Sequence, residues 1–278
     1  MAKISDLLDT ALKAALKAGK KTLEYYHTEM TVVVKDDHSP LTQADLESNQ
    51  IINEYLDSTE VPILSEENKN DPYEVRKEWT SFWLIDPLDG TKEFINKRAE
   101  YTINIALVEN GIPVLGVVYA PALDLLYFGS KKHGSFKLKE ASNYSVDKIR
   151  KHAKQIEVGE LSKKLRVVAS RSHLSEETSR FIDNLDKHKS IGKMTSIGSS
   201  LKLCMIAEGK ADIYPRLGPT MEWDTAASHA VVLYAGGIVI ETSYFQPLSY
   251  NKADLHNPYF IVYNPALDKI VRKIITEG

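Results

Sequence analysis

The sequence has 278 residues, of which 43% are hydrophobic and 26% are charged, and its formal net charge is −3. These proportions are typical of a globular protein with a large core, and the small negative charge excludes a surface that coats nucleic acid polymers. Cys204 is the only cysteine, which excludes a disulfide framework and a cysteine-based metal site. The N-terminus has no apolar core of signal-peptide length and no apolar run could span a bilayer, so we expect a cytoplasmic protein without transmembrane segments.

The first 60 residues predict two helices separated by a short strand. Apolar residues recur at helical spacing from the start of the chain, which indicates an amphipathic helix that ends near Gly19 or continues to about Tyr26. The β-branched run at 31–35 leads through a turn to Thr42, a residue type that commonly caps a helix, and a second helix follows. Asp45 falls in the first turn of that helix. There a carboxylate can simply stabilise the helix dipole, and a functional role is the alternative.

Two apolar strands are followed by carboxylates. The stretch 61–64 leads to Glu66, and the stretch 79–85 leads to Asp-Pro-Leu-Asp-Gly-Thr at residues 86–91. Charged side chains are rarely buried without a partner, so two aspartates at the end of a buried strand require a cation or solvent. The intervening residues 68–78 are charged and are predicted to form a loop.

The remainder of the chain predicts strands first and then alternating strands and helices. An Asn-Gly pair at 110–111 between apolar runs indicates a hairpin, and further short strands follow to about residue 139. The polar stretch 143–162 suggests a boundary between two lobes. We therefore expect an N-terminal α+β lobe of helices against an antiparallel sheet, residues 1–145, and a C-terminal α/β lobe, residues 146–278.

Two polar stretches and one aspartate stand out in the C-terminal half. Ser-Arg-Ser-His at 170–173 follows a predicted strand, and Ser-Ile-Gly-Ser-Ser-Leu-Lys at 196–202 opens a predicted helix. The second stretch can hold a phosphate or ribose, or it can be a serine-capped helix without a ligand. His173 can likewise be a capping or surface residue. Asp224 begins an alanine-rich helix.

The acidic residues at these element ends predict a site for a hard cation. Mg²⁺ takes oxygen ligands and is held by a few carboxylates together with substrate phosphate, and a carboxylate cluster repels itself unless cations or shifted pKa values relieve it. Pro87 makes the turn after the strand rigid, Gly90 lets a ligand approach the backbone, and Thr91 can orient a water molecule. A capped strand-to-helix turn is the alternative interpretation of this stretch.

Three motifs taken together resemble those of the inositol-monophosphatase superfamily, which comprises Mg²⁺-dependent, lithium-sensitive phosphatases. They are Glu66, the stretch 86–91 and Trp-Asp-Thr-Ala-Ala at 223–227, and residues 35–45 match the N-terminal motif of the family. The resemblance covers nearly the whole chain. It implies the layered αβαβα sugar-phosphatase fold, an α+β arrangement.

Within the superfamily, the chain most resembles the CysQ-type 3′(2′),5′-bisphosphate nucleotidases. The stretch Thr-Lys-Glu-Phe at 91–94 carries this resemblance, together with the stretches at 170–173 and 196–202. It implies hydrolysis of the 3′-phosphate of adenosine 3′,5′-bisphosphate to AMP and phosphate in sulfur assimilation, with phosphoadenylyl sulfate as a second substrate. An inositol monophosphatase or sugar-phosphate phosphatase is the alternative, and a non-catalytic nucleotide-binding regulator is an alternative of another class.

The roles of the family carry over by motif, and they imply two or three Mg²⁺ ions per site. Asp45 and Thr91 match the pair that activates the attacking water. The implied metal ligands are Glu66, Asp86, the carbonyl of Leu88, Asp89 and Asp224. The implied substrate contacts are Glu66, Asp89, Gly90, Thr91, Ser170, His173, Gly198, Lys202 and Asp224. Glu222 is an additional carboxylate that could touch the substrate side of the site. The resemblance leaves open a monomer or a homodimer, and peripheral association with the inner face of the membrane.

Overall fold

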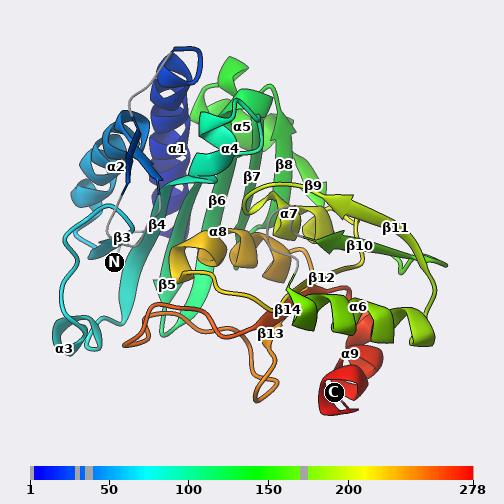
Figure 1. Ribbon diagram of the computed structural model, residues 1–278. Helices are drawn as coiled ribbons and strands as arrows, with labels where there is room; N and C mark the ends of the chain where they lie inside the picture. Colours follow the sequence, from blue (N-terminus) through cyan, green and yellow to red (C-terminus); the bar gives the residue numbers. More distant parts are fainter. Residues whose placement is uncertain (1–2, 29–31, 35–39, 170–174, 278) are drawn as a thin grey trace.

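The computed structural model describes residues 3–28, 32–34, 40–169 and 175–277, which form five layers (Figure 1). Two helices cover one face of a seven-stranded sheet, two lie between this sheet and a five-stranded sheet, and two cover the outer face of the second sheet. In that order the helices are α1 (Ile4–Tyr26), α2 (Gln43–Leu56), α7 (Leu201–Ala207), α8 (Glu222–Leu233), α6 (Glu176–His188) and α9 (Asp268–Glu277). The predicted αβαβα layering is confirmed.

The seven-stranded sheet has its strands in chain order, from β3 to β9. Only β3 and β4 are parallel, and all the other neighbours are antiparallel. The strands are β3 (Ile63–Ser65), β4 (Ser81–Asp89), β5 (Thr102–Glu109), β6 (Ile112–Ala120), β7 (Leu125–Ser130), β8 (Gly134–Lys139) and β9 (Lys154–Ile156).

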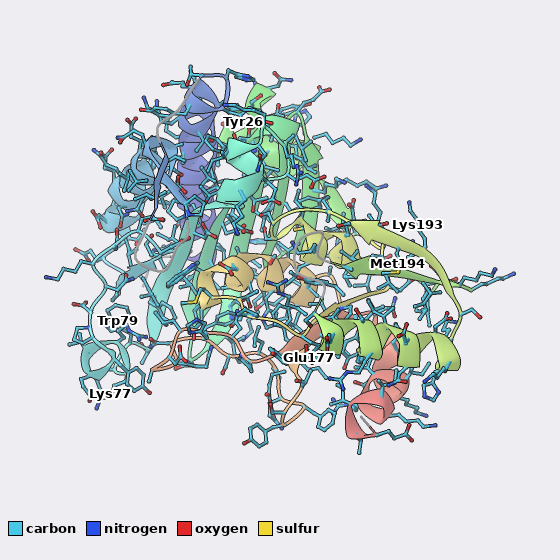
Figure 2. All side chains as sticks on the ribbon, in the orientation of Figure 1. Tyr26, Lys77, Trp79, Glu177, Lys193 and Met194 are labelled. Carbon is cyan, nitrogen blue, oxygen red and sulfur yellow. The ribbon has the colours of Figure 1, made fainter. Side chains whose placement is uncertain are left out.

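The five-stranded sheet has the order β11-β10-β12-β14-β13. Strand β10 is parallel to β11 and β12, whereas β14 is antiparallel to β12 and β13. Its strands are β10 (Leu165–Ala169), β11 (Ile191–Ser196), β12 (Ile213–Arg216), β13 (Ile238–Glu241) and β14 (Phe260–Tyr263). Figure 2 shows Lys193 and Met194 on β11, the edge strand far from α1. A separate antiparallel pair, β1 (Val32–Val34) and β2 (Pro40–Thr42), precedes α2.

The alternation of side chains along β5 determines which face of the large sheet carries the site. Ile103 and Ile105 pack in the apolar cluster beneath α1 and α2. Thr102, Asn104 and Ala106 therefore point to the opposite face, where α7 and α8 pack. Thr102 and Asn104 are buried polar residues, so this face carries hydrogen-bonding groups at the end of the strand.

Gly116 of β6 allows α8 to lie directly on the large sheet. A Cβ atom at this position would lie 2.1 Å from the carbonyl oxygen of Ala227, which is backbone and cannot move aside. The close contact fixes the height of α8 above the sheet, and α8 carries Asp224 in its first turn.

Several sequence predictions can be compared with these elements. The first helix continues to Tyr26, and Thr42 is the N-cap of α2, as predicted. The predicted loop at 68–78 is partly wrong, because Pro72 begins a one-turn helix, α3 (Tyr73–Arg76). The polar stretch at 143–162 contains α5 (Val146–His152) as well as β9. The lobe boundary near residue 145 stays a prediction. Across the described ranges, no helix has the length and apolar character needed to cross a membrane.

Candidate active site

Glu66 directly follows β3, and Asp86 lies on the neighbouring part of β4, where the parallel pairing of the two strands ends. Ser65 of β3 is in register with Ile85 of β4, and the next residue of each strand is acidic. The N–H of Glu66 donates to the carbonyl of Ile85 over 3.2 Å, so the pairing extends to this point. The two carboxylates therefore begin from adjacent backbone positions, as expected for the carboxyl ends of parallel strands.

A bulge in β4 separates Asp86 from Asp89. Asp86 lies opposite Asn104 and Asp89 opposite Thr102, so three residue steps on β4 match two on β5. The N–H of Leu88 donates to Asp86 Oδ1 over 3.0 Å inside the bulge. Such bulges change the direction of side chains, and here the bulge lies between two acids in the last residues of β4.

Gly90 completes the turn after this bulge. Its φ of +88° lies in the left-handed region, which glycine adopts without steric cost. A short helix, α4 (Thr91–Ile95), follows at once. This turn brings Thr91 back toward α2.

Asp45 and Thr91 lie together, and their role in activating the attacking water stays a prediction. The hydroxyl of Thr91 is 3.3 Å from both Asp45 Oδ1 and the carbonyl of Leu88, and it can donate to only one of them at a time. The other oxygen of Asp45 accepts from the N–H of Thr42 over 2.8 Å and from the Thr42 hydroxyl. Asp45 is 3% exposed. Burial raises its pKa to about 6, although the hydrogen bonds from Thr42 oppose this shift.

Asp224 approaches the same region from the first turn of α8. Its Oδ2 accepts from the N–H of Met221 over 2.9 Å, the reciprocal half of a capping box. Burial raises the pKa of Asp224 to about 8, and the negative charges of Asp89 and Glu66 add to the shift. Burial and the charges of Glu66, Asp89 and Asp224 likewise raise the pKa of Asp86. The four predicted carboxylates therefore act on one another electrostatically.

The chemistry of this donor set fits a hard cation. One oxygen of each of Asp86, Asp89 and Asp224 accepts hydrogen bonds from the protein, and the other has no such partner among the described residues. Burial is the main cause of the raised pKa values, and a divalent cation would relieve the repulsion that adds to them. Carboxylate oxygens are the ligands that Mg²⁺ prefers. Within the described ranges, however, no three His, Cys, Asp or Glu side chains converge closely enough to form a metal site. The assignment of these residues as metal ligands stays a prediction.

The loop before α7 is hydrogen-bonded to Asp89. The N–H of Ser200 donates to Asp89 Oδ2 over 2.7 Å, and the Ser199 hydroxyl donates to the same oxygen. The Ser200 hydroxyl donates to Asn104 Oδ1 over 2.8 Å. Thr102 contacts both serine hydroxyls. These bonds fix the start of α7 against the end of the large sheet.

Gly198 and Lys202 lie on the same loop and helix. The N–H of Gly198 donates to Glu100 Oε2 over 2.8 Å, and a Cβ at Gly198 would lie 3.0 Å from Glu100 and Glu93. The N–H of Gly198 is thus bonded within the protein. The ammonium of Lys202 donates to the carbonyl of Ser199, and burial lowers its pKa.

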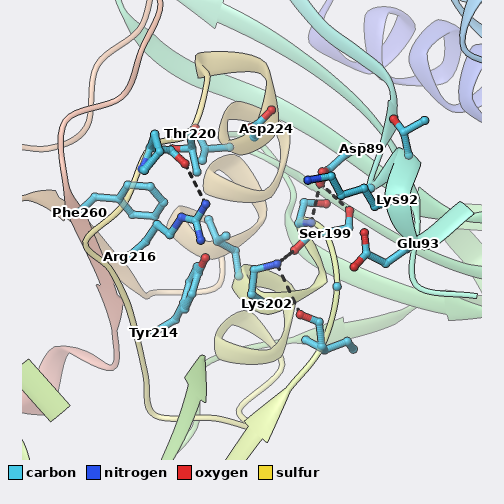
Figure 3. Close-up of a pocket in the computed structure, with 18 of the residues that line it drawn as sticks. Asp89, Lys92, Glu93, Ser199, Lys202, Tyr214, Arg216, Thr220, Asp224 and Phe260 are labelled. Atoms are coloured by element: carbon cyan, nitrogen blue, oxygen red, sulfur yellow. Dashed lines mark hydrogen bonds between the residues drawn. The ribbon is translucent and has the colours of Figure 1, made fainter. Parts of the chain in front are cut away.

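A cavity of ≈ 320 Å³ lies between the two halves of the chain (Figure 3). Among the predicted site residues, those in its wall are Asp89, Gly90, Thr91, Gly198, Lys202 and Asp224. The predicted residues Asp45, Glu66, Asp86 and Leu88 are not part of this wall. Ser170 and His173 lie outside the described residues.

One wall of this cavity was not predicted from the sequence. Figure 3 shows Tyr214, Arg216 and Phe260 opposite Asp89 and Lys92. The rings of Tyr214 and Phe260 are 6.2 Å apart, edge to face. Arg216 donates to the carbonyl of Pro219 over 2.8 Å, and its buried Nε has no hydrogen-bond partner among the described residues. Arg216, near the end of the apolar stretch 211–217, could have indicated this wall from the sequence.

Glu222 does not touch the substrate side of the site. It is 0% exposed and it accepts hydrogen bonds from the backbone N–H groups of Asn251 and Lys252, over 2.6 and 3.0 Å. Residues two apart on a helix point in different directions, so closeness in sequence to Asp224 did not place both carboxylates in one cavity. The expectation for Glu222 is wrong.

With this geometry established, comparison with known proteins identifies the family. The chain matches the model of the inositol monophosphatase family over residues 3–274. The chain belongs to the inositol monophosphatase family. This family is generally Mg²⁺-dependent.

Members of the family with named activities are close in sequence. The 3′(2′),5′-bisphosphate nucleotidase CysQ of Escherichia coli (strain K12) is 43% identical over 263 residues, which cover 92% of this chain and 99% of that protein. CysQ of Haemophilus influenzae is 37% identical, and the match covers 92% of each chain.

Solved structures of the family share the fold. The crystal structure of CysQ from Bacteroides thetaiotaomicron, described as a bacterial member of the family, has a TM-score of 0.85 at 43% identity, covering 94% of this chain and 97% of that one. An inositol monophosphatase from Thermotoga maritima has a TM-score of 0.76 at 23% identity, covering 98% and 97%. The second likeness shows the fold alone.

Proposed function

We propose that this protein is a Mg²⁺-dependent 3′(2′),5′-bisphosphate nucleotidase that converts adenosine 3′,5′-bisphosphate to AMP and phosphate in sulfur metabolism. The identity of 43% with E. coli CysQ, over 99% of that protein, supports the substrate. The observation that carries the reaction class is the Asp45–Thr91 contact of 3.3 Å beside a set of mutually repelling carboxylates. Phosphoadenylyl sulfate is proposed as a second substrate.

The metal ligands in this proposal are Glu66, Asp86, the Leu88 carbonyl, Asp89 and Asp224, which would hold two or three ions. Bound Mg²⁺ supplies positive charge that neutralises the phosphate oxygens and makes the attacking water more acidic. The protein contributes rigid placement, because Leu88, Met221 and Ser200 donate backbone N–H groups to Asp86, Asp224 and Asp89, respectively.

Asp45 and Thr91 can orient and deprotonate the attacking water. When the Thr91 hydroxyl donates to Asp45, its oxygen is left as an acceptor for a water proton. That proton can pass through Thr91 to Asp45. With a pKa of about 6, Asp45 is mostly ionised at neutral pH yet is a stronger base than an exposed aspartate.

The newly found wall of the cavity supports a nucleotide substrate. Arg216 on this wall and Lys92 on the opposite side add positive charge to the cavity that Lys202 also lines, where the phosphates would bind. Tyr214 and Phe260 line the cavity, although they are 2% and 1% exposed and give it an apolar backing rather than a free stacking surface. Ser170, His173 and Gly198 stay predicted nucleotide contacts. Location in the cytoplasm, peripheral membrane association and the choice between monomer and homodimer also stay predictions.

A panel of substrates tests this function. We expect Mg²⁺-dependent, Li⁺-inhibited phosphate release that is fastest with adenosine 3′,5′-bisphosphate. Faster release from inositol 1-phosphate or fructose 1,6-bisphosphate would support the inositol or sugar phosphatase instead. Binding of the nucleotide with no release from any substrate would support the non-catalytic regulator.

A further inference from the structure

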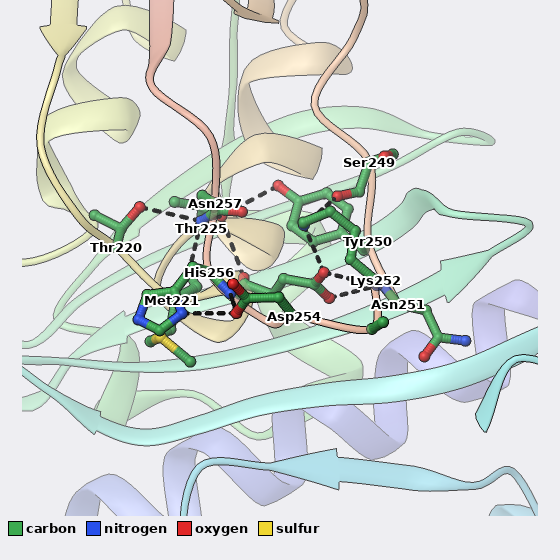
Figure 4. A network of polar contacts seen from close by, with 12 residues as sticks. Thr220, Met221, Thr225, Ser249, Tyr250, Asn251, Lys252, Asp254, His256 and Asn257 are labelled. Carbon is green, nitrogen blue, oxygen red and sulfur yellow. Dashed lines mark hydrogen bonds and ion pairs between the residues drawn. The ribbon is translucent and has the colours of Figure 1, made fainter. Parts of the chain in front are cut away.

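Glu222 is the centre of a buried polar network beside α8. Its Oε1 accepts from the N–H and the ammonium of Lys252, and its Oε2 accepts from the N–H of Asn251. A buried carboxylate requires such compensation, because it has lost its hydration. We call residues 251–257 the clamp loop. Its first two residues wrap around Glu222, and Figure 4 shows Asn251 and Lys252 beside Tyr250 at this end of the network.

The far end of the clamp loop is paired with the residues that begin α8. The N–H of Glu222 donates to the carbonyl of Leu255 over 2.9 Å. The side-chain amide of Asn257 donates to the carbonyl of Met221 over 2.7 Å and to the Thr225 hydroxyl over 3.0 Å. Figure 4 shows Asn257 between these partners. Both ends of the clamp loop therefore contact residues in the first turn of α8.

The same loop is also attached to the N-terminal half of the chain. Arg76 of α3 donates to the side-chain oxygen of Asn251 over 2.8 Å and to the carbonyl of Lys252 over 3.1 Å. In return, the side-chain amide of Asn251 donates to the carbonyl of Arg76 over 2.6 Å. Arg76 is 4% exposed, although its neighbour Lys77 is exposed at the edge of the molecule (Figure 2).

These contacts connect the two chain segments that carry the predicted metal ligands. Arg76 lies in the connection from Glu66 to Asp86, and Glu222 is two residues before Asp224. Burying charged groups carries a desolvation penalty that offsets their mutual attraction and brings little net stability, so the best-attested use of such a network is to fix one relative position of two elements. We propose that Arg76, Asn251 and Glu222 form a positioning clamp that sets the distance between Asp224 and the N-terminal carboxylates, and thereby the metal affinity. The clamp rests on the proposed function.

The test measures Mn²⁺ binding to the whole protein by titration calorimetry, together with the thermal unfolding midpoint. The variants are Arg76→Met, Glu222→Gln and the double variant. The matched control is Arg166→Met, which breaks the contact between Arg166 and the buried carboxylate of Asp212, away from the cavity. We expect each clamp variant to weaken Mn²⁺ binding at least tenfold. The double variant should bind Mn²⁺ only slightly more weakly than the single variant with the larger effect, because the two residues act as one unit. The control should unfold at a lower temperature and bind Mn²⁺ like the wild type.

A third variant, which is expected to disturb folding less, controls for misfolding of the other two. Asn251 has a φ of +75°, so Asn251→Gly removes its side-chain contacts with Arg76 and keeps a backbone that glycine accepts. We expect weaker Mn²⁺ binding in this variant as well. Clamp variants with lowered midpoints but wild-type Mn²⁺ affinity would overturn the proposal and leave the network a purely structural role. A wild-type protein that binds no Mn²⁺ would overturn the metal site itself, which is a separate failure.

Discussion

Replacing Asp45 by asparagine should reduce catalysis and increase stability in the same variant. A pKa raised from 3.8 to about 6 means that the folded protein holds this carboxylate in its charged form at a cost. Each pKa unit corresponds to 1.36 kcal/mol, so at pH 7.5 the cost is about 3 kcal/mol. Asparagine has the same shape and can still accept from Thr42, but it carries no charge and cannot accept a proton. We therefore expect Asp45→Asn to raise the free energy of unfolding by up to about 3 kcal/mol.

Activity should change in the opposite direction. General-base catalysis typically contributes about 10²–10⁴-fold, so we expect phosphate release to fall by that factor. Urea unfolding in EDTA at pH 7.5 and pH 4.5 measures the first effect. The folded carboxylate protonates below its pKa of about 6, so the stability gain should shrink as the pH falls toward 3.8.

A matched variant separates the site from a general charge effect. Asp147 is an exposed aspartate in the first turn of α5, so Asp147→Asn removes a similar charge at a comparable helix position. It should leave phosphate release unchanged and alter stability by less than about 1 kcal/mol. An Asp45→Asn variant that retains turnover within threefold of the wild type, or that is clearly less stable at pH 7.5, would refute the reasoning.

Three further predictions concern other parts of the molecule. Asp89→Asn should weaken Mg²⁺ binding and reduce phosphate release by orders of magnitude without unfolding the protein, as phosphate-release assays and circular dichroism would show; near-normal activity would count against the metal site. Arg216→Met should raise KM for adenosine 3′,5′-bisphosphate about tenfold or more while KM for inositol 1-phosphate stays the same, and equal effects on both would exclude a nucleotide contact. Burial lowers the pKa of His229 to about 3, so this group adds stability above pH 6.5 that is lost as the pH falls toward 3. Between pH 7.5 and pH 5, His229 should lower the free energy of unfolding by about 2 kcal/mol. Urea titrations should show that His229→Gln lacks this pH-dependent decrease.

The acids of the site could be predicted because they interrupt apolar patterns at element ends. Glu66 directly follows β3, Asp86 and Asp89 lie in the last part of β4, and the parallel register of the two strands brings Glu66 and Asp86 side by side. The sequence likewise predicted that a helix begins at Thr42 and Asp45, and the structure places both residues at the start of α2. Local patterns of this kind depend only on neighbours in the chain.

The aromatic and arginine wall could not be predicted in the same way. Tyr214 and Phe260 are residue types that are common in any strand. Only the pairing of β12 with β14 places them beside one cavity. Glu222 shows the opposite error, since it is close to Asp224 in sequence but turned toward the clamp loop. The missing information was the strand pairing in the first case and the direction of a helical side chain in the second.

The most direct test of the proposed activity is phosphate release from adenosine 3′,5′-bisphosphate by the wild-type protein, with Mg²⁺ and with EDTA. We predict release that requires Mg²⁺, that exceeds release from inositol 1-phosphate, and that yields AMP as the only nucleotide product. Release that persists in EDTA, or a preference for inositol 1-phosphate, would contradict the proposed function.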